Sequence, residues 1–250
     1  MIALHGRTAL VTGGGRGIGR AVVAMLARAG ADVAIGFRSR ADDANAVAME
    51  VRSLGRRAIT IGGDLADPGA SDHIVAQVTK TFGRLDIFVA NAGIWPPEDL
   101  PLARLPAQRW RHTMAVNLDG VYYSTRAALG LMGPGGRIVL VSSTAGQRGE
   151  AGQADYAATK GALIALTKSL AIECAPDILV NCVAPGWVDT EMAAPAFGGD
   201  AKARIAATIP LGRIPTAEQI AGPIVFLCSD LASHITGEIL NVNGGSVLCG

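Results

Sequence analysis

The sequence predicts an α/β fold in one domain, a doubly wound parallel sheet with helices on both faces. Along the whole chain, apolar runs of strand length alternate with segments whose apolar residues have helical spacing. A glycine-rich turn at residues 12–19 separates the first run from the first helical segment. No linker, low-complexity tract or charge block divides the 250 residues, so we expect residues 1–250 to form a single domain.

The elements are expected in alternating order. A strand at residues 8–12 precedes a helix with one apolar face, and a strand at 32–37 precedes an alanine-rich helix at 42–54. Further strands are expected at residues 58–61, 86–90, 137–141, 179–183 and 239–242, with helical segments such as 110–131 between most of them. This alternation indicates parallel pairing through right-handed crossovers, and such sheets bind ligands at the carboxyl ends of their strands.

Composition excludes several function classes. Half of the residues are hydrophobic, 17% are charged and the formal net charge is +1, which argues against binding to nucleic acid or anionic membranes. The four cysteines show no CxxC or CxxH spacing, so neither a metal site nor a disulfide framework is indicated. Reduced thiols and an N-terminal apolar run too short for a signal or membrane segment predict a cytoplasmic protein.

The turn TGGGRGIG, residues 12–19, is a candidate nucleotide-binding loop. Glycines at 13, 17 and 19 allow a tight turn and a close approach of the backbone to a pyrophosphate. The spacing GxxxGxG differs from the GxGxxG fingerprint, and an ordinary glycine-rich turn is the alternative. Its place directly after the first strand favours the nucleotide site.

The end of the second strand indicates which cofactor is bound. NAD sites place an acid there, about 20 residues past the glycines, whereas an arginine accommodates the 2′-phosphate of NADP. Here the strand ends in Phe37, Arg38, Ser39 and Arg40, and Arg16 in the glycine turn is a further cation. We therefore predict NADP(H) over NAD(H). That Arg38 and Arg40 are solvated loop charges remains the alternative.

Ser143, Tyr156 and Lys160 are candidates for proton transfer. Tyr156 and Lys160 lie four residues apart in an alanine-rich helical segment and share one face. A neighbouring ammonium lowers the pKa of a phenol from about 10, and a serine at a strand end can hold a carbonyl oxygen near it. A chance pair at the edge of the core is the alternative.

Other polar residues follow later strands of the predicted sheet. Asp64 and Leu65 follow the third strand, and residues 91–93 (Asn-Ala-Gly) follow the fourth. At neighbouring strand ends they are candidates for adenine and ribose contacts, although each is also ordinary turn chemistry. Asn117 stands among apolar residues in the helical region, where a helix-kinking or capping amide is the alternative.

Together these motifs resemble the short-chain dehydrogenase/reductase family. The resemblance covers nearly the whole chain in order, including Ser143 thirteen positions before Tyr156 and the segment PGWVDT at residues 185–190. It is strongest to the beta-ketoacyl-acyl-carrier-protein reductases and related NADP-dependent carbonyl reductases, through GQADYAATKGAL and the VNGG near the C-terminus. The resemblance implies a Rossmann-type NAD(P)-binding catalytic domain.

The resemblance also implies roles for residues. Tyr156 would be the general acid in reduction and the base in oxidation, Lys160 would bind the nicotinamide ribose, and Ser143 would orient the carbonyl. Asn117 would hold a water that passes protons to Lys160. The implied cofactor-binding residues are Gly13, Gly15, Arg16, Gly17, Ile18, Gly19, Arg38, Ser39, Asp64, Leu65, Asn91, Ala92, Gly93, Tyr156, Lys160, Pro185, Gly186, Val188 and Thr190.

The expected substrate pocket is apolar, with a substrate loop at about residues 188–212. Its residues are Trp95, Ser143, Gln153, Trp187 and Met192. Trp95 and Trp187 could equally pack against one another. An enzyme that acts on an acidic carrier protein is expected to carry Lys or Arg side chains beside the substrate entrance. Residues 131–136 and 174–177 contain neither.

The predicted function is NADP(H)-dependent interconversion of a ketone, either a 3-oxoacyl thioester or another carbonyl, and a secondary alcohol. An NAD-dependent sugar or polyol dehydrogenase is the alternative, followed by a non-catalytic NADP-binding scaffold. The helix at residues 162–172 is apolar almost all round, so a second copy is expected to cover one face. We expect a homotetramer, a small-molecule substrate, and neither nucleic acid nor membrane as a partner.

Overall fold

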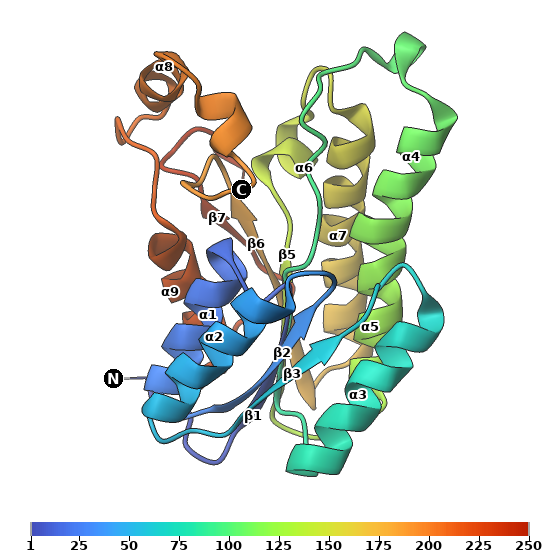
Figure 1. The fold of residues 1–250 in the computed structure, drawn as a ribbon, viewed down its shortest axis with the longest axis vertical. Helices are drawn as coiled ribbons and strands as arrows, with labels where there is room; N and C mark the ends of the chain where they lie inside the picture. The colour runs from blue at the N-terminus through green and yellow to red at the C-terminus, as the bar shows by residue number, and fades with distance from the viewer. Residues whose placement is uncertain (1, 250) are drawn as a thin grey trace.

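A computed structural model describes residues 2–249 and shows one parallel sheet between two layers of helices (Figure 1). Its strands follow the order β3-β2-β1-β4-β5-β6-β7, and every neighbouring pair is parallel. The bounds are β1 Thr8–Thr12, β2 Asp32–Phe37, β3 Ala58–Gly62, β4 Ile87–Ala90, β5 Gly136–Val141, β6 Ile178–Pro185 and β7 Ile239–Val242. All seven predicted strands are confirmed, and most bounds agree within a residue.

The helices divide between the two faces of the sheet. One face carries α1 (Gly17–Arg28), α2 (Ala41–Ser53) and α9 (Ala217–Leu227). The other carries α3 (Pro68–Phe82), α5 (Gly120–Leu129) and α7 (Ala154–Glu173), with α4 (Ala107–Met114) beside α7 (Figure 1). Every residue of β1, β4 and β5 is buried, because helices cover both sides of these strands.

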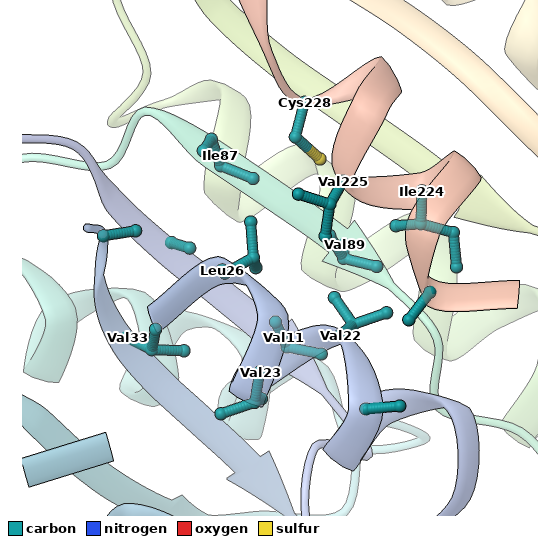
Figure 2. Close-up of a cluster of buried hydrophobic side chains, with 14 of the residues drawn as sticks. Val11, Val22, Val23, Leu26, Val33, Ile87, Val89, Ile224, Val225 and Cys228 are labelled. Carbon is teal, nitrogen blue, oxygen red and sulfur yellow. The ribbon is translucent and has the colours of Figure 1, made fainter. Parts of the chain in front are cut away.

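Figure 2 shows the core that holds α1 against the sheet. Val22 and Leu26 of α1 lie between the strand residue Val11 and the α9 residue Val225. All four side chains are at most 1% exposed. Burial of each such aliphatic side chain contributes roughly 1.5–3 kcal/mol, so this packing fixes the start of α1, and with it the glycine turn that precedes the helix.

The strand order reverses between β1 and β4. After β3 at one edge, the chain crosses back to place β4 on the far side of β1. Helices before and after this reversal lie on opposite faces, so the connections at the carboxyl ends of β1 and β4 diverge and leave a crevice. The fold therefore predicts the ligand site beside residues 12–19 and 91–93.

The predicted helix at 110–131 is interrupted. A π-helical turn, Ala115–Asp119, joins α4 to α5, and Asn117 lies at its centre. The segment expected as a substrate loop, residues 188–212, also contains helical structure: a 3₁₀ turn, Ala194–Phe197, and helix α8, Ala201–Thr208.

Among residues 2–249, no helix is long and apolar enough to span a membrane, and no cluster of metal-binding side chains is found.

Candidate active site

The glycine turn after β1 lies against the end of β4. Gly13 and Gly17 have positive φ angles of 65° and 51°, which L side chains rarely adopt. A Cβ atom on Gly13 would lie 3.1 Å from the Asn91 side-chain nitrogen. No side chain fits on the turn where it meets the end of β4, so only glycine backbone lies there. A turn of bare backbone is also what a close approach to a nucleotide phosphate requires.

Thr12 fixes these two strand ends relative to each other. Its hydroxyl oxygen accepts hydrogen bonds from the backbone N–H groups of Asn91 and Ala92, both at 3.1 Å. In return, the Asn91 side-chain amide donates to the carbonyl oxygens of Thr12 and Gly13 at 3.0 and 3.3 Å. The amide of Asn91 is therefore used to shape the crevice.

Gly19 is an exception among the predicted cofactor-binding residues, because it does not line the cleft. A Cβ atom at this position would lie 2.2 Å from the carbonyl oxygen of Gly13. Gly19 therefore allows the first turn of α1 to pack against the glycine turn, and direct contact between Gly19 and the cofactor stays a prediction.

Three arginines surround the cleft at the end of β2. Arg38 is exposed, while Arg16 and Arg40 both donate to one carboxylate oxygen of Glu191, at 3.2 and 3.0 Å. Hydrogen bonds from these two guanidinium groups hold the pKa of Glu191 below its usual value. The structure thus brings Arg16 and Arg40 together at one carboxylate, an acid that was not predicted from the sequence.

Ser143 and Tyr156 stand at the starts of two helices beyond β5. Ser143 caps helix α6 (Thr144–Arg148), where its hydroxyl accepts from the Ala145 N–H at 3.2 Å. The neighbouring Ser142 is buried, and its hydroxyl donates to the Lys160 carbonyl oxygen at 2.7 Å. Ser143, and not Ser142, therefore lies beside Tyr156, as the thirteen-residue spacing indicated.

Lys160 is buried beneath the tyrosine. Its ammonium donates to the Val141 carbonyl oxygen at 2.8 Å and lies 5.7 Å from the centre of the Tyr156 ring. Burial lowers the pKa of Lys160 to about 8, because a low-dielectric environment disfavours the charged form. An ammonium at this position is therefore close to titration at neutral pH.

The pKa of Tyr156 moves opposite to the expected direction. Burial raises it, a hydrogen bond with Ser143 lowers it in part, and the nearby charge of Glu150 raises it again. The Lys160 ammonium donates to the Val141 carbonyl oxygen rather than to the phenol, and burial dominates the pKa of Tyr156. The tyrosine is therefore held as the neutral phenol, the form that donates a proton.

Asn117 does not line the cleft, because its side chain is completely buried. Its oxygen accepts from the Ile94 N–H at 2.8 Å, and its nitrogen donates to the Ile94 carbonyl at 2.9 Å. Both polar groups therefore hold the segment after β4 in place. This explains the π-helical turn, which directs Asn117 inward, and a part for Asn117 in a water relay stays a prediction.

Gln153 forms the back of the pocket wall. It is 1% exposed, and its nitrogen donates to the Pro96 carbonyl and the Asp99 carboxylate at 2.9 and 2.8 Å. Its oxygen accepts from Arg109 at 3.0 Å. Gln153 lines the cleft, as the sequence predicted, but these bonds occupy its amide and support the loop that carries Trp95. A direct contact between Gln153 and a substrate stays a prediction.

Arg109 and Asp155 form a buried ion pair next to Tyr156. The guanidinium Nε lies 3.1 Å from a carboxylate oxygen, and Asp155 is completely buried. Burial alone raises the pKa of Asp155, but hydrogen bonds from Arg109, Thr113 and the Tyr156 N–H outweigh it and hold the pKa below its usual value. The pair thus anchors the first turn of α7, which carries the tyrosine, to α4.

Aromatic side chains line the far end of the cleft. Trp95 and Trp187 meet edge to face with ring centroids 5.6 Å apart, and Trp187 packs against Phe197 at 5.7 Å. Both tryptophans and Met192 line the cleft, and their contact with a substrate stays a prediction. The tryptophans also contact each other, so the alternative of mutual packing holds as well.

One cleft of about 650 Å³ connects these groups. It runs from the arginines at the end of β2, past the glycine turn, to Ser143, Tyr156 and the tryptophans. The residues present fit a nicotinamide dinucleotide: glycine backbone and the start of a helix for the pyrophosphate, arginines for a further phosphate, and Lys160 for a ribose. Of the predicted cofactor and pocket residues, all but Gly19 line it.

Comparison with known proteins identifies the family. Residues 13–246 match the family profile described as enoyl-(acyl carrier protein) reductase. The chain is 41% identical over 248 residues to the 3-oxoacyl-[acyl-carrier-protein] reductase FabG of Aquifex aeolicus, covering 98% of each chain. This chain belongs to the short-chain dehydrogenase/reductase family. The resemblance inferred from the motifs is confirmed, and with it an oxidoreductase that uses a nicotinamide cofactor.

Two other relatives show the breadth of this family. The L-rhamnose 1-dehydrogenase (NAD(P)(+)) of a Sphingomonas species is 40% identical over 250 residues, covering 98% of each chain. A short-chain dehydrogenase from Burkholderia cenocepacia, solved in complex with NADP, superimposes with a TM-score of 0.92. It is 41% identical and covers 97% of this chain and 98% of that one. These short-chain dehydrogenases/reductases therefore include both reductases and sugar dehydrogenases.

Sequence reasoning missed three parts of the site. Phe197 packs against the cleft residue Trp187, Glu191 bridges two arginines, and the Arg109–Asp155 pair supports α7. The partners in the two ion-pair groups are 46 to 175 residues apart, so no local pattern joins them. The available signal was weak: Asp155 directly precedes the candidate tyrosine in the alanine-rich helical segment.

Proposed function

We propose that this short-chain dehydrogenase/reductase is an NADP(H)-dependent enzyme that interconverts a ketone and a secondary alcohol. The observation that supports this most strongly is that Ser143, Tyr156 and Lys160 line the same cleft as the glycine turn. In this proposal the nicotinamide, when bound, supplies or accepts the hydride. The protein supplies position and a proton.

Each of the three side chains has a distinct proposed role. The Ser143 hydroxyl holds the carbonyl oxygen, and the neutral Tyr156 phenol donates a proton to that oxygen during reduction. Lys160 binds the ribose hydroxyls through its ammonium, which has three donors. In oxidation the proton moves back to the tyrosine.

Preference for NADP(H) is supported by the charges at the end of β2. No acid occupies the four positions Phe37, Arg38, Ser39 and Arg40, and Arg38 is exposed at the cleft. A guanidinium binds phosphate through paired N–H donors, whereas a ribose hydroxyl favours a carboxylate. The solved relative in complex with NADP agrees with this proposal.

Arg38→Asp is expected to reverse the cofactor preference. Loss of a hydrogen bond to a charged group costs about 1.5–3 kcal/mol, so KM for NADPH should rise about 10- to 100-fold. KM for NADH should stay level or fall, because the new carboxylate can accept from the ribose hydroxyls. Steady-state kinetics with both cofactors measure this change.

Arg104→Asp is the control, because it makes the same charge change at an exposed position outside the cleft. If Arg38→Asp leaves the NADPH preference unchanged, the phosphate site is misplaced.

Reduction is expected to slow as the pH rises above about 8. The profile of kcat/KM against pH reports titrating groups of the free enzyme, and the pKa of Lys160 is lowered to about 8. Below this pH the ammonium is present and binds ribose; above it, the neutral amine binds ribose more weakly. Lys160→Arg keeps its charge to far higher pH, so its residual activity should lack this step. A wild-type profile that is flat through the pKa would contradict the role given to Lys160.

The substrate is proposed to be a 3-oxoacyl thioester or another carbonyl. Similarity to FabG supports the thioester, and the apolar wall of Trp95 and Trp187 accommodates an acyl chain. Sugar oxidation is the second candidate. Its support is the L-rhamnose dehydrogenase relative, together with the carboxylates of Asp99 and Glu150 in the cleft, which can accept bonds from hydroxyls.

Parallel assays distinguish these candidates. NADPH and NADH oxidation are measured with acetoacetyl thioesters, diketones and aromatic ketones, and NAD(P)⁺ reduction with L-rhamnose and other aldoses. Thioester turnover supports the 3-oxoacyl proposal, and turnover of free ketones alone indicates a general carbonyl reductase. Rhamnose oxidation alone would move the assignment to sugars. NADPH binding without any turnover favours the non-catalytic scaffold.

We further propose a cytoplasmic homotetramer. The outer face of α7 ends in Ile172, which is 82% exposed in the single chain, and a second copy is expected to cover this face. The four cysteine thiols are free, as in a reducing compartment.

A further inference from the structure

Glu191 connects two distant parts of the nucleotide end of the cleft. It follows Thr190 in the segment after β6, and one of its carboxylate oxygens accepts from both Arg16 and Arg40. Arg16 belongs to the glycine turn and directly precedes α1, and Arg40 directly precedes α2. A single acid in the 188–212 segment therefore holds two cations that the sequence assigns to the surroundings of a phosphate.

The position of Glu191 is fixed from two sides. Thr190 lies directly against the glycine turn, because a Cβ atom on Gly17 would meet the Thr190 methyl group at 3.5 Å. Arg40 is itself held by Asp43, at 2.8 Å between Nε and Oδ2. Glu191 and the arginines, Arg38 included, all line the one cleft.

Glu191 and a 2′-phosphate would bind the same positively charged side chains. Arg16, Arg38 and Arg40 carry three positive charges, against the two negative charges of Glu191 and Asp43. A 2′-phosphate brings about 1.5–2 further negative charges and three strong acceptor oxygens, the same chemistry that Glu191 offers with two oxygens and one charge. A phosphate and a carboxylate cannot both take the same N–H donors of Arg16 and Arg40.

We propose that Glu191 competes with the 2′-phosphate of the cofactor for Arg16 and Arg40, and thereby sets how strongly the enzyme prefers NADPH. This rests on the proposed NADP(H)-dependent function and deepens it. With NADH, Glu191 keeps both arginines and holds the 190–208 segment against the glycine turn. With NADPH, the phosphate takes the arginines and Glu191 is released, so the segment loses one of its attachments.

The simpler view is that this is a surface ion pair of little consequence. Arg16, Arg40 and Glu191 are each more than half exposed as side chains, and exposed pairs contribute little to stability. That view predicts equal, small effects on both cofactors when Glu191 is neutralised. Competition predicts a change in their ratio, so the two are separable by binding measurements.

The test is Glu191→Gln, with dissociation constants for NADPH and NADH measured by titration calorimetry at low and high salt. Loss of the competing charge should tighten NADPH binding about 5-fold, the lower end of typical coupling between sites, while NADH binding stays level or weakens. The fragments 2′-AMP and 5′-AMP should repeat this difference. The gain should shrink at high salt, because the charges are exposed.

Glu50→Gln is the matched control. Glu50 also bridges two arginines, Arg20 and Arg28, at 3.5 and 3.3 Å, but it lies on α2 outside the cleft. Its neutralisation changes the net charge equally and should leave the NADPH to NADH ratio unchanged. Glu191→Gln with the wild-type ratio, or with equal weakening for both cofactors, would overturn the proposal. Wild-type protein that binds neither cofactor would overturn the proposed function.

Hydrogen exchange gives a readout independent of affinity. In wild-type protein, backbone amides of residues 190–208 should exchange faster with NADPH bound than with NADH bound. In Glu191→Gln this difference between the two complexes should disappear. Equal exchange in both wild-type complexes would contradict release of the segment.

Discussion

Replacing Tyr156 by phenylalanine is expected to lower kcat by about 10²–10⁴-fold, the usual contribution of general acid–base catalysis. The substitution removes only the hydroxyl, which the burial-raised pKa keeps protonated and ready to donate. The ring, and its contact with the Lys160 ammonium, remain. Dissociation constants for NADPH should therefore stay within about twofold of wild type, because the missing group acts on the substrate carbonyl.

Tyr122→Phe is the matched control. Tyr122 lies on α5, is 49% exposed, and does not line the cleft. Its hydroxyl should be dispensable, and turnover should equal that of wild type. If Tyr156→Phe retained most of its turnover with normal cofactor binding, another group would have to supply the proton, and the roles given to Ser143 and Tyr156 would be wrong.

Arg109→Met is expected to cause the largest loss of stability. It leaves the Asp155 carboxylate buried without its ion-pair partner, and breaking a buried pair from one side typically costs about 3–5 kcal/mol. It also removes the hydrogen bonds that Arg109 donates to the Gln153 side-chain oxygen and to the Glu98 carbonyl oxygen. For a chain of this size the melting temperature should fall by roughly 6–20 °C, measured by calorimetry or circular dichroism.

Two further variants show whether the loss of stability comes from the unpaired buried carboxylate or from the loss of an arginine side chain as such. Arg148→Met removes the partner of Glu150 from an exposed pair and should shift stability by less than about 1 kcal/mol. Adding Asp155→Asn to Arg109→Met should recover part of the loss, because the orphaned charge is then absent. If Arg109→Met melted within about 2 °C of wild type, the pair would not anchor α7 as described.

Most of the fold could be predicted from the sequence because its signals are local. Apolar runs such as residues 137–141 are buried on both faces, and helical spacing follows each of the first strands. The glycine turn at residues 12–19 is similarly readable, since positive φ at Gly13 and Gly17 requires glycine. Most of the predicted site residues follow the carboxyl ends of parallel strands, and these ends meet at one edge of the sheet, so the residues line one cleft.

The remaining features depend on packing between distant segments. The π-helical turn at Asn117 arises because the side chain bonds to Ile94, and no periodicity reveals that partner. The pKa of Tyr156 depends on burial and on where the Lys160 ammonium points, which spacing along a helix does not specify. Glu191 meets Arg16 across 175 residues for the same reason.

The most direct test of the central claim is transfer of a labelled hydride. Wild-type protein is incubated with a 3-oxoacyl thioester or ketone found active in the parallel assays and with NADPH that carries deuterium at the transferred position. The product is analysed by mass spectrometry. We predict one deuterium at the new carbinol carbon, and a loss of product in Tyr156→Phe that parallels its loss of kcat. A product without deuterium, or equal product formation by the variant, would contradict hydride transfer with Tyr156 as the proton donor.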